Sequence, residues 1–571
     1  MLSNLRDFEP LRPAERMLLR SCATGGIAKV SYRRPMVATA DVTVRAPFLA
    51  YLCRAGGVHI EGRRIEVVGA WIVGRLNLLD AVVPLGLWMY RCTFDTTPLL
   101  DGARFTGSVG LPGCSLPGLR AEGCSIAGDL TLNAGCTVLG EVRLSRTTIG
   151  RDLNCERLRL RGRGEDIARP RRPLVADGAH IGGDVGLGDG FEALGEVRFV
   201  GTRVDGDLRA GAACLTAHLD SSGARGVALN LDRAHVAGSV RLDAGLKCAG
   251  RVRMAGVRVE GDIDCSRARF DVVGDGAWGT DLALRLDRAR VGGALVLRRL
   301  GAPLQGASLE GARVGTLADD HSAWGERLAL DGFSFHRLAP DAPADAAFRI
   351  DWLARQLPAH LGADWRAAPW RQTIRVLRRM GHDRSARELA IERETRLRQV
   401  GRIGVGEPGA LRWLLRCGHA AFGALAGYGH RPLRLLAALG VVWILGAVLF
   451  SQVARVGQMA PAHLSVYADP AVATCRAATG RWDGCDALPP VYPAFSPLLY
   501  SLDQLLPGVD LRQLRHWVPA PTPSRCAGLC LEDRWAWVAR WAGVLEGLLG
   551  AGGMALLLAS LAGLTDRDRR R

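Results

Sequence analysis

The hydrophobic positions of this chain recur with a fixed period. The stretch Ile181–Asp207, IGGDVGLGDGFEALGEVRFVGTRVDGD, recurs with substitutions at Ile126–Asp152 and at Val236–Asp262. The apolar residue that follows each Gly-Asp-like pair recurs every 55 residues. Its four positions are Leu130, Val185, Val240 and Leu295. A period that holds over four copies requires stacked repeats, because loop lengths drift in an ordinary globular core.

Each 55-residue unit contains two unequal steps. The Gly-Asp-Leu-type motif recurs after a shorter step, from Val185 to Leu208, and then after a longer step, from Leu208 to Val240. Short alternation of apolar and polar positions predicts strands with one buried and one exposed face. We therefore expect two coils of a β-helix per unit, the second carrying an insertion, with the insertions stacked along one edge. The predicted insertions are Arg161–Arg172, Ala213–Gly226 and Val272–Thr280.

The repeats resemble pentapeptide-repeat and related right-handed β-solenoid proteins, with a period looser than five. This resemblance implies a mainly β fold with a right-handed parallel β-solenoid over residues 58–335. A recurring aspartate at the turns is able to bind a cation or to accept hydrogen bonds from nearby backbone amides. The second role is favoured, because nothing resembles the glycine-rich calcium repeat. The aspartates are Asp129, Asp152, Asp184, Asp207 and Asp262.

Helical patterns flank the repeats on both sides. Residues 1–57 contain two short amphipathic segments, Pro13–Cys22 and Ala46–Arg54. We expect this segment to form a helical cap over the open strand edges of the first coil. Residues 336–430 lose the alternation and predict a cytoplasmic helical linker, with an amphipathic helix at Trp370–Met380.

Two stretches near the C-terminus are long and apolar enough to cross a bilayer. Leu435–Val453 contains no charged residue, and Trp541–Leu564 contains only Glu546. Arginines beside the spans favour a two-pass protein of the cell membrane with both termini in the cytoplasm. The corresponding segments are 431–456 for the first transmembrane helix, 457–534 for an extracytoplasmic loop and 535–571 for the second helix with its basic tail.

Four cysteines cluster in the extracytoplasmic loop. An oxidising exterior favours disulfides over a metal site for this group, and its three pairings stay open. The four are Cys475, Cys485, Cys526 and Cys530. The scattered cysteines between Cys22 and Cys265 occupy repeat positions that other copies fill with alanine, leucine or serine, so we expect small buried hydrophobes there.

The apolar stretch Phe495–Leu511 lies between the two spans and is too short to cross a bilayer. It contains Tyr500, Asp503 and Asp510, and two placements stay open: a re-entrant segment, as in a pore loop, or an interfacial helix. An acidic residue inside a span is a functional candidate by default. Glu546 therefore faces either a pore or a neighbouring helix.

The chain of 571 residues carries a net charge of +17, which suggests an acidic partner. The sharpest basic cluster is the first insertion, which either faces phosphate or forms a solvated loop. Its arginines are Arg161, Arg163, Arg169, Arg171 and Arg172. Because the repeat strands lack aromatic residues for stacking on bases, we expect no nucleic-acid partner.

Several segments together resemble actinobacterial membrane proteins labelled membrane-associated oxidoreductases. They are the repeats, Gly427–Pro432, the first span, Ser501–Leu511 and the second span ending in Ala562–Thr565. The resemblance implies redox activity. The residues themselves show no CxxC, CxxCH or βαβ dinucleotide unit, and we identify no catalytic, cofactor-binding or metal-binding set.

These patterns predict a non-catalytic, membrane-anchored cytoplasmic β-solenoid that acts as a scaffold or protein-interaction module. Its expected partners are membrane lipid and a protein on the solenoid, with self-association left open and no cofactor. The alternatives are a membrane-associated oxidoreductase and a channel-like two-span oligomer gated by the solenoid.

Overall fold

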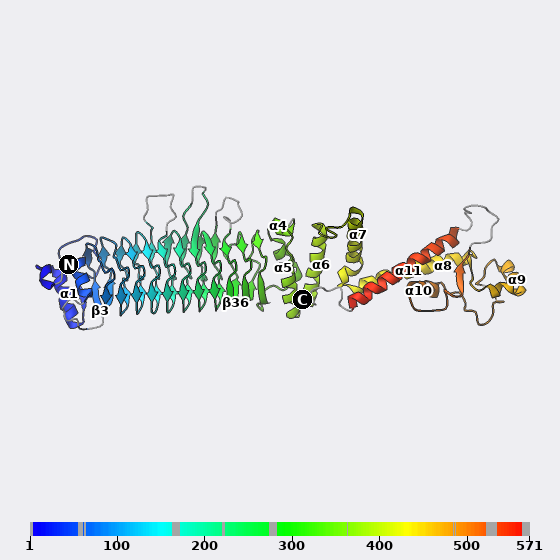
Figure 1. Cartoon of the computed structure of the whole chain (residues 1–571), viewed down its shortest axis with the longest axis horizontal. Helices are drawn as coiled ribbons and strands as arrows, with labels where there is room; N and C mark the ends of the chain where they lie inside the picture. Colours follow the sequence, from blue (N-terminus) through cyan, green and yellow to red (C-terminus); the bar gives the residue numbers. More distant parts are fainter. Residues whose placement is uncertain are drawn as a thin grey trace. The chain divides into compact units, whose positions relative to one another are not determined.

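The computed structural model describes residues 4–54, 61, 64–162, 172–219, 223–272, 282–362, 364–483, 485, 487–520 and 534–561. The chain forms two compact units, Met1–Leu389 and Ala390–Arg571, and the boundary falls inside helix α6 (Asp383–Gln399). We call them unit 1 and unit 2. Unit 1 holds the repeats, and unit 2 holds both long apolar helices (Figure 1).

Unit 1 is built on three parallel sheets with 21, ten and nine strands. Each coil of the chain adds two short strands to the large sheet, then one to the ten-stranded sheet and one to the nine-stranded sheet. One such coil consists of β12 (Ser125–Ile126), β13 (Leu130–Thr131), β14 (Thr137–Val138) and β15 (Val142–Arg143). Figure 1 shows the resulting rows of short arrows. The predicted ladder of parallel strands is therefore confirmed.

The strand register reproduces both predicted steps. Leu130 pairs with Leu153 across a shorter coil, and Leu153 pairs with Val185 across a longer one. The same two steps follow from Val185 to Leu208 and from Leu208 to Val240. Since each pair lies directly opposite in a parallel ladder, the alternating loop length leaves the side-chain columns in phase.

Each longer coil carries its extra residues between the ten-stranded and the nine-stranded sheet. The second insertion begins later than predicted, because Cys214–Thr216 forms strand β26 and pairs with both neighbouring coils. The strand pairs that flank the insertions are β18 (Arg159–Leu160) and β19 (Leu174–Val175), β26 and β27 (Val227–Asn230), and β34 (Arg269–Asp271) and β35 (Leu284–Arg285).

The interior of the ladder consists of stacked aliphatic and cysteine side chains. Leu130, Leu153 and Val185 are buried in successive coils. Cys92 and Cys114 are also stacked and buried, and burial raises the pKa of Cys114 well above its ordinary value. The expectation of buried cysteines holds throughout the described ladder except at Cys214, which is exposed.

The recurring aspartates connect one coil to the next. The Asp152 carboxylate accepts the backbone N–H of Asp184 at 2.8 Å, and the Asp184 carboxylate accepts that of Asp207 at 2.8 Å. Asp207 accepts the backbone N–H of Ser239 in the same way, also at 2.8 Å. The predicted role as acceptors of backbone amides is confirmed, but the donors belong to the following coil and not to the local turn.

The glycine before each of the three donor residues makes room for this contact, and these glycines are Gly183, Gly206 and Gly238. A Cβ atom on Gly183 would lie 2.0 Å from Asp152 Oδ1. Arg151 occupies the same column one coil earlier, and there the hydrogen bond from Asp152 N–H to Asp129 lengthens to 3.3 Å. The Gly-Asp motif is thus a coil-to-coil connector, since the glycine admits the carboxylate that the next backbone amide needs.

Gly183→Ala is expected to lower the free energy of unfolding by about 1–3 kcal/mol, because the added methyl group displaces the Asp152 carboxylate. In an Asp152→Ala background the same substitution should cost at least about 1 kcal/mol less, since the clashing atom is gone. Urea unfolding of the four proteins measures both values. Arg151→Ala is the control, with an expected change below about 0.5 kcal/mol; equal costs of Gly183→Ala in both backgrounds would contradict the connector role.

An Arg–carboxylate pair ties the N-terminal helices to the first strands. Arg45, which ends β2 (Thr43–Arg45), donates to Glu15 of α1 (Pro13–Thr24) at 2.6 and 2.8 Å. Burial opposes ionisation of Glu15, but hydrogen bonds from Arg45 and from the Arg12 backbone hold its pKa below the ordinary 4.5. Helix α2 (Ala46–Cys53) follows at once, so both predicted N-terminal helices are present.

The last coil is covered by helices. In α3 (Ala346–Ala354), Arg349 donates to Asp319 at 2.7 and 2.8 Å, and both side chains are fully buried. Helix α5 (Ala368–Arg379) packs on β40 (Ser334–Leu338), where Gln372 donates to the Phe335 carbonyl at 2.7 Å. Helix α5 corresponds to the amphipathic helix predicted at Trp370–Met380, and it ends one residue earlier than predicted. Between them lies α4 (Pro358–Leu361).

Unit 2 contains two helices that are long and apolar enough to cross a membrane. They are α8 (Pro432–Arg455), which contains an 18-residue stretch of mean hydropathy 2.3, and α11 (Arg534–Leu561), which contains one of mean hydropathy 1.7. Its other described elements are α7 (Gly409–Ala426), α9 (Pro470–Thr479), α10 (Pro497–Leu505), the antiparallel pair β41 (Met459–Pro461) and β42 (Trp517–Pro519), and the short 3-10 helices η2 (Gly427–Gly429) and η3 (Leu464–Ala468).

Candidate functional site

Helix α10 packs against the central stretches of both α8 and α11. The Trp443 indole of α8 donates to the Leu498 carbonyl at 2.9 Å, and the Ser501 hydroxyl lies 2.9 Å from the Trp443 carbonyl. On the other side, the Gln504 amide donates to the Gly543 carbonyl of α11 at 2.8 Å. The short helix is therefore held along its length by polar contacts to two apolar helices.

Glu546 lies inside this three-helix contact. Its side chain is only 4% exposed, and it hydrogen-bonds to Ser501, which is fully buried. The Ser501 hydroxyl has one proton but faces two acceptors, the Trp443 carbonyl and the Glu546 carboxyl. Both contacts are satisfied when Glu546 carries a proton and donates it to Ser501, while Ser501 donates to Trp443. Of the two predicted orientations, the structure places Glu546 against neighbouring helices.

Glycines on both long helices allow this close approach. A Cβ atom on Gly446 of α8 would lie 2.5 Å from Ser501 Oγ and 2.6 Å from the Glu546 carboxyl oxygens. A Cβ atom on Gly550 of α11 would lie 1.9 Å from the Leu505 carbonyl oxygen. The glycine positions thus determine how deeply α10 inserts between α8 and α11.

The other candidates in this segment have structural contacts. Tyr500 is buried against Phe450, with ring centroids 4.7 Å apart. Asp503 accepts the backbone N–H groups of three residues that follow α10, at 2.9–3.0 Å, and so holds the returning turn. Those three are Leu511, Gln513 and Leu514. Asp510 is exposed and pairs with Arg515 at 3.0 Å.

Of the four clustered cysteines, Cys475 and Cys485 form a disulfide with their Cα atoms 5.7 Å apart. Cys526 and Cys530 lie outside the described residues. Of the basic insertion, Arg163, Arg169 and Arg171 also lie outside them. Its two described arginines are Arg161, which is exposed, and Arg172, which donates to Glu196 at 3.3 Å.

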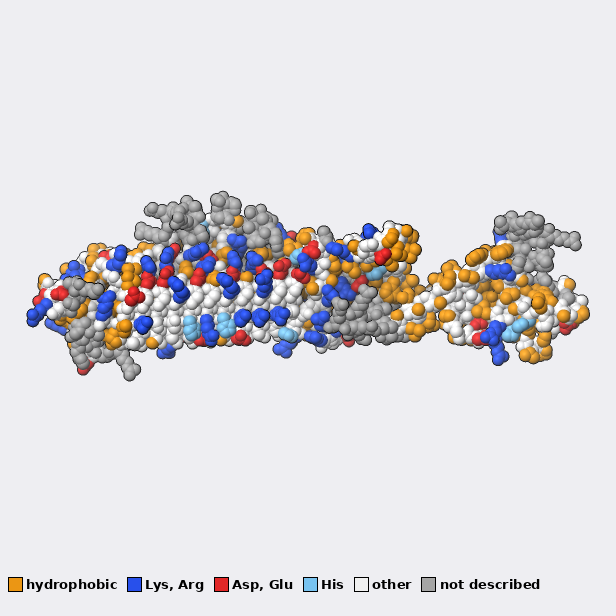
Figure 2. Space-filling view, viewed as in Figure 1, with side chains coloured by type: hydrophobic (Ala, Val, Ile, Leu, Met, Phe, Trp, Pro, Cys, Tyr) orange, Lys and Arg blue, Asp and Glu red, His pale blue; other side chains and the backbone are white. Residues whose placement is uncertain are grey.

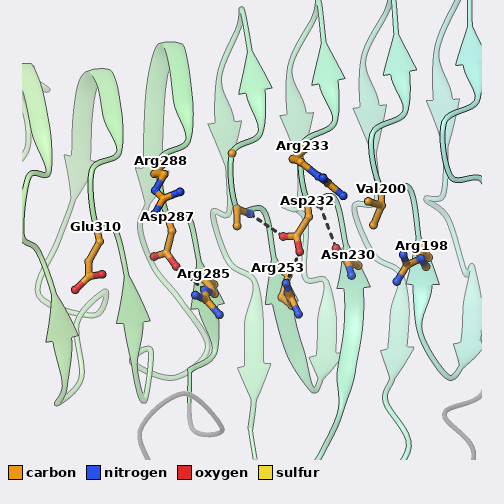
Figure 3. Close-up of a pocket in the computed structure, with 12 residues that line it drawn as sticks. Arg198, Val200, Asn230, Asp232, Arg233, Arg253, Arg285, Asp287, Arg288 and Glu310 are labelled. Atoms are coloured by element: carbon orange, nitrogen blue, oxygen red, sulfur yellow. Dashed lines mark hydrogen bonds and ion pairs between the residues drawn. The ribbon is translucent and has the colours of Figure 1, made fainter.

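A shallow groove of about 600 Å³ runs across five coils on the nine-stranded sheet. Figure 3 shows arginine and carboxylate side chains alternating along it. Arg198 of β23 (Val197–Arg198) donates to Asp177 at 2.6 Å, and Arg253 pairs with Asp232 in the same arrangement two coils on. Neighbouring coils thus neutralise one another across this face.

A different column of basic residues runs along the large sheet. Each of its members opens a strand and lies opposite the next in register. We call it the basic row: His180, Arg203, His235, Arg258, Arg290 and Arg313. Sequence reasoning missed it, although each residue directly precedes an inward-facing valine or isoleucine. Figure 2 shows basic side chains lined up along this face of unit 1.

No family model, curated protein or solved structure matches this chain. The resemblance to membrane-associated oxidoreductases therefore stays an expectation from the sequence. Within the described part of the chain, no group of three or more His, Cys, Asp or Glu side chains is placed to hold a metal ion.

Proposed function

We propose that this protein is a membrane-anchored β-solenoid that docks other proteins on its repeat faces, without catalysis of its own. One observation carries the proposal: the same chain contains a long ladder of parallel strands with polar faces and two apolar helices whose outer faces are exposed. The ladder is suited to binding, since stacked repeats form an extended and regular surface. Helices α1 and α2 cap one end of a right-handed coil in this proposal, and α3 to α5 cap the other.

The outer faces of α8 and α11 support insertion in a bilayer. Leu445 is 65% exposed, Leu548 is 67% exposed and Trp541 is 69% exposed. Apolar surface of this extent needs a lipid or protein partner. Trp443 of α8 and Glu546 of α11 are hydrogen-bonded to residues of α10, as a hydrocarbon environment requires of polar groups inside it.

The same arrangement supports a re-entrant position for α10, which both enters and leaves from one side. Ser501 contacts the middle of α8, and Leu505 contacts the middle of α11. If α8 and α11 span the bilayer, α10 reaches its centre, and the turn held by Asp503 lies within the membrane. Arg431, which precedes α8, and Arg434 in its first turn then favour a cytoplasmic unit 1, with the Cys475–Cys485 disulfide on the outer side.

The experiment combines membrane fractionation with site-specific crosslinking of the full chain. We expect the protein to stay in the membrane pellet after alkaline carbonate extraction. A photoreactive residue on the large sheet, at Thr148, should yield a discrete crosslinked protein, whereas one at exposed Tyr32 should not. Release by carbonate would overturn the anchoring, and the absence of any face-dependent crosslink would overturn the docking function.

The position of α10 favours a second candidate, a channel-like oligomer in which this half-helix lines a pore. Purified protein in planar bilayers should then conduct ions, and Glu546→Gln should change the conductance by altering the packing of α10. A silent bilayer, or a variant with unchanged conductance, would remove this candidate and leave the docking function untouched.

A further inference from the structure

The basic row is an uninterrupted line of four arginines and two histidines on one face of the large sheet. Its six residues belong to six successive coils and lie directly opposite one another in the parallel ladder. Adjacent strands are about 4.8 Å apart, so the six positions span roughly 24 Å. The strands are β20 (His180–Ile181), β24 (Arg203–Val204), β28 (His235–Val236), β32 (Arg258–Val259), β36 (Arg290–Leu297) and β38 (Arg313–Asp319).

Three of the six residues of the row contact an acidic side chain of the protein itself. Asp205 lies 2.9 Å from His180 and 2.8 Å from Arg203, and Glu260 lies 3.5 Å from His235. Asp205 lies two residues after Arg203 and Glu260 lies two residues after Arg258, but the Glu260 carboxylate pairs with His235 of the preceding coil and not with Arg258. In the coils of Arg290 and Arg313 the position two residues after the arginine is glycine, at Gly292 and Gly315.

The other half has no such neutralisation. Arg258, Arg290 and Arg313 are exposed and form no ion pair with any residue that the structure describes. The nine-stranded sheet provides the comparison, because there Arg198, Arg253 and Arg285 each pair with an aspartate.

Stacking these three arginines costs stability. Like charges directly opposite on adjacent strands repel, and the backbone register prevents the strands from separating. A guanidinium binds carboxylates through two parallel hydrogen bonds, so an anionic ligand along the row would offset the repulsion.

We propose that Arg258, Arg290 and Arg313 bind an acidic segment of a partner protein, which lies along the row and places carboxylates against the three guanidinium groups. The proposal rests on the docking function and identifies the chemistry of the partner. A protein segment is favoured over nucleic acid, because no strand of the row carries a Phe, Tyr or Trp side chain on which bases could stack, and both histidine rings lie against acidic side chains. The straight, planar row also suits an extended chain better than the helical backbone of a duplex.

The test measures binding of fluorescent poly-L-glutamate to the full chain in detergent by anisotropy. In the variant Arg258→Thr/Arg290→Thr/Arg313→Thr the affinity should fall about tenfold or more, and wild-type binding should weaken with added salt. Threonine fits this column, since Thr148 of the preceding coil lies opposite His180 in the ladder. The single variant Arg290→Gln should lose about two- to fivefold, and it serves if the triple variant does not fold.

The control removes three other exposed arginines of unit 1, as Arg233→Asn/Arg267→Asn/Arg288→Asn. These arginines have positive φ angles, from 56° to 61°, which asparagine accepts. Binding of poly-L-glutamate should stay within about twofold of wild type. An equal loss in the control would show an effect of net charge alone and overturn the proposal.

A 20-base-pair DNA duplex is the competing probe. Tighter binding of the duplex than of poly-L-glutamate, with the same dependence on the three arginines, would assign the row to a nucleic-acid backbone and overturn the proposal. Failure here is separable from failure of the docking function. A crosslinked partner that persists in the triple variant refutes the row alone, whereas the absence of any face-dependent crosslink in the wild type refutes docking.

Discussion

Asp319→Ala is expected to lower the free energy of unfolding of unit 1 by about 3–5 kcal/mol. Asp319 accepts two hydrogen bonds from the Arg349 guanidinium at 2.7 and 2.8 Å and one from the Trp324 indole at 2.8 Å. The pair is fully buried. Removing the carboxylate therefore leaves a buried cation without its counter-ion and an indole N–H without an acceptor.

We expect the loss of one partner of the Asp319–Arg349 ion pair to lower the free energy of unfolding more than the loss of both partners. Asp319→Leu/Arg349→Met should recover most of the lost stability, because apolar side chains of similar size avoid burying a charge. Urea unfolding of the full chain, followed by far-UV circular dichroism, measures the three values. The control is Asp351→Ala, on the same helix as Arg349. It removes an exposed ion pair with Arg355 and should lower the free energy of unfolding by less than about 1 kcal/mol. A similar loss in Asp319→Ala and Asp351→Ala would contradict the prediction.

Gly550→Ala is expected to disrupt the contact between α10 and α11. The added Cβ atom would lie 1.9 Å from the Leu505 carbonyl oxygen and 2.7 Å from its carbon, and a backbone carbonyl cannot move aside as a side chain can. The two helices must separate, so the packing around Ser501 and Glu546 is lost as well. We expect a destabilisation of unit 2 of about 3 kcal/mol.

Gly552→Ala is the matched control, because a Cβ atom at this position meets no atom within 4 Å. It lies two residues further along the same helix and should leave stability unchanged or slightly raised, since alanine favours helix formation. Thermal unfolding of both variants in detergent compares them directly. Equal melting temperatures for the two variants would show that α10 does not pack against α11 at this depth.

The two predictions concern different kinds of buried contact. The Asp319 carboxylate stabilises the fold by compensating a buried charge, whereas Gly550 stabilises it because the absence of a side chain lets α10 approach α11 closely. The polar contacts of α10 add a third kind, since Ser501, Gln504 and Trp443 each hydrogen-bond to a backbone carbonyl of a neighbouring helix. This is the arrangement by which a short helix between two spans becomes a stable part of the structure.

Much of this molecule follows from its sequence alone. The alternating shorter and longer steps could be predicted because each coil adds one strand to every ladder, so the apolar residues recur with the period of the coils. The two long apolar helices were equally readable from length and hydropathy. Tyr500, Asp503 and Glu546 could be named as candidates because polar groups in apolar stretches are costly unless they have a role.

Other features were decided only by the tertiary structure. The partners of Glu546 come from two helices distant in the chain, so no local pattern reveals Ser501 or Gly446. Arg258, Arg290 and Arg313 form a row only because a longer coil and then a shorter coil bring them opposite one another. Periodicity along a chain determines which residues face inward, whereas charge neutralisation between coils depends on which side chains the register places side by side.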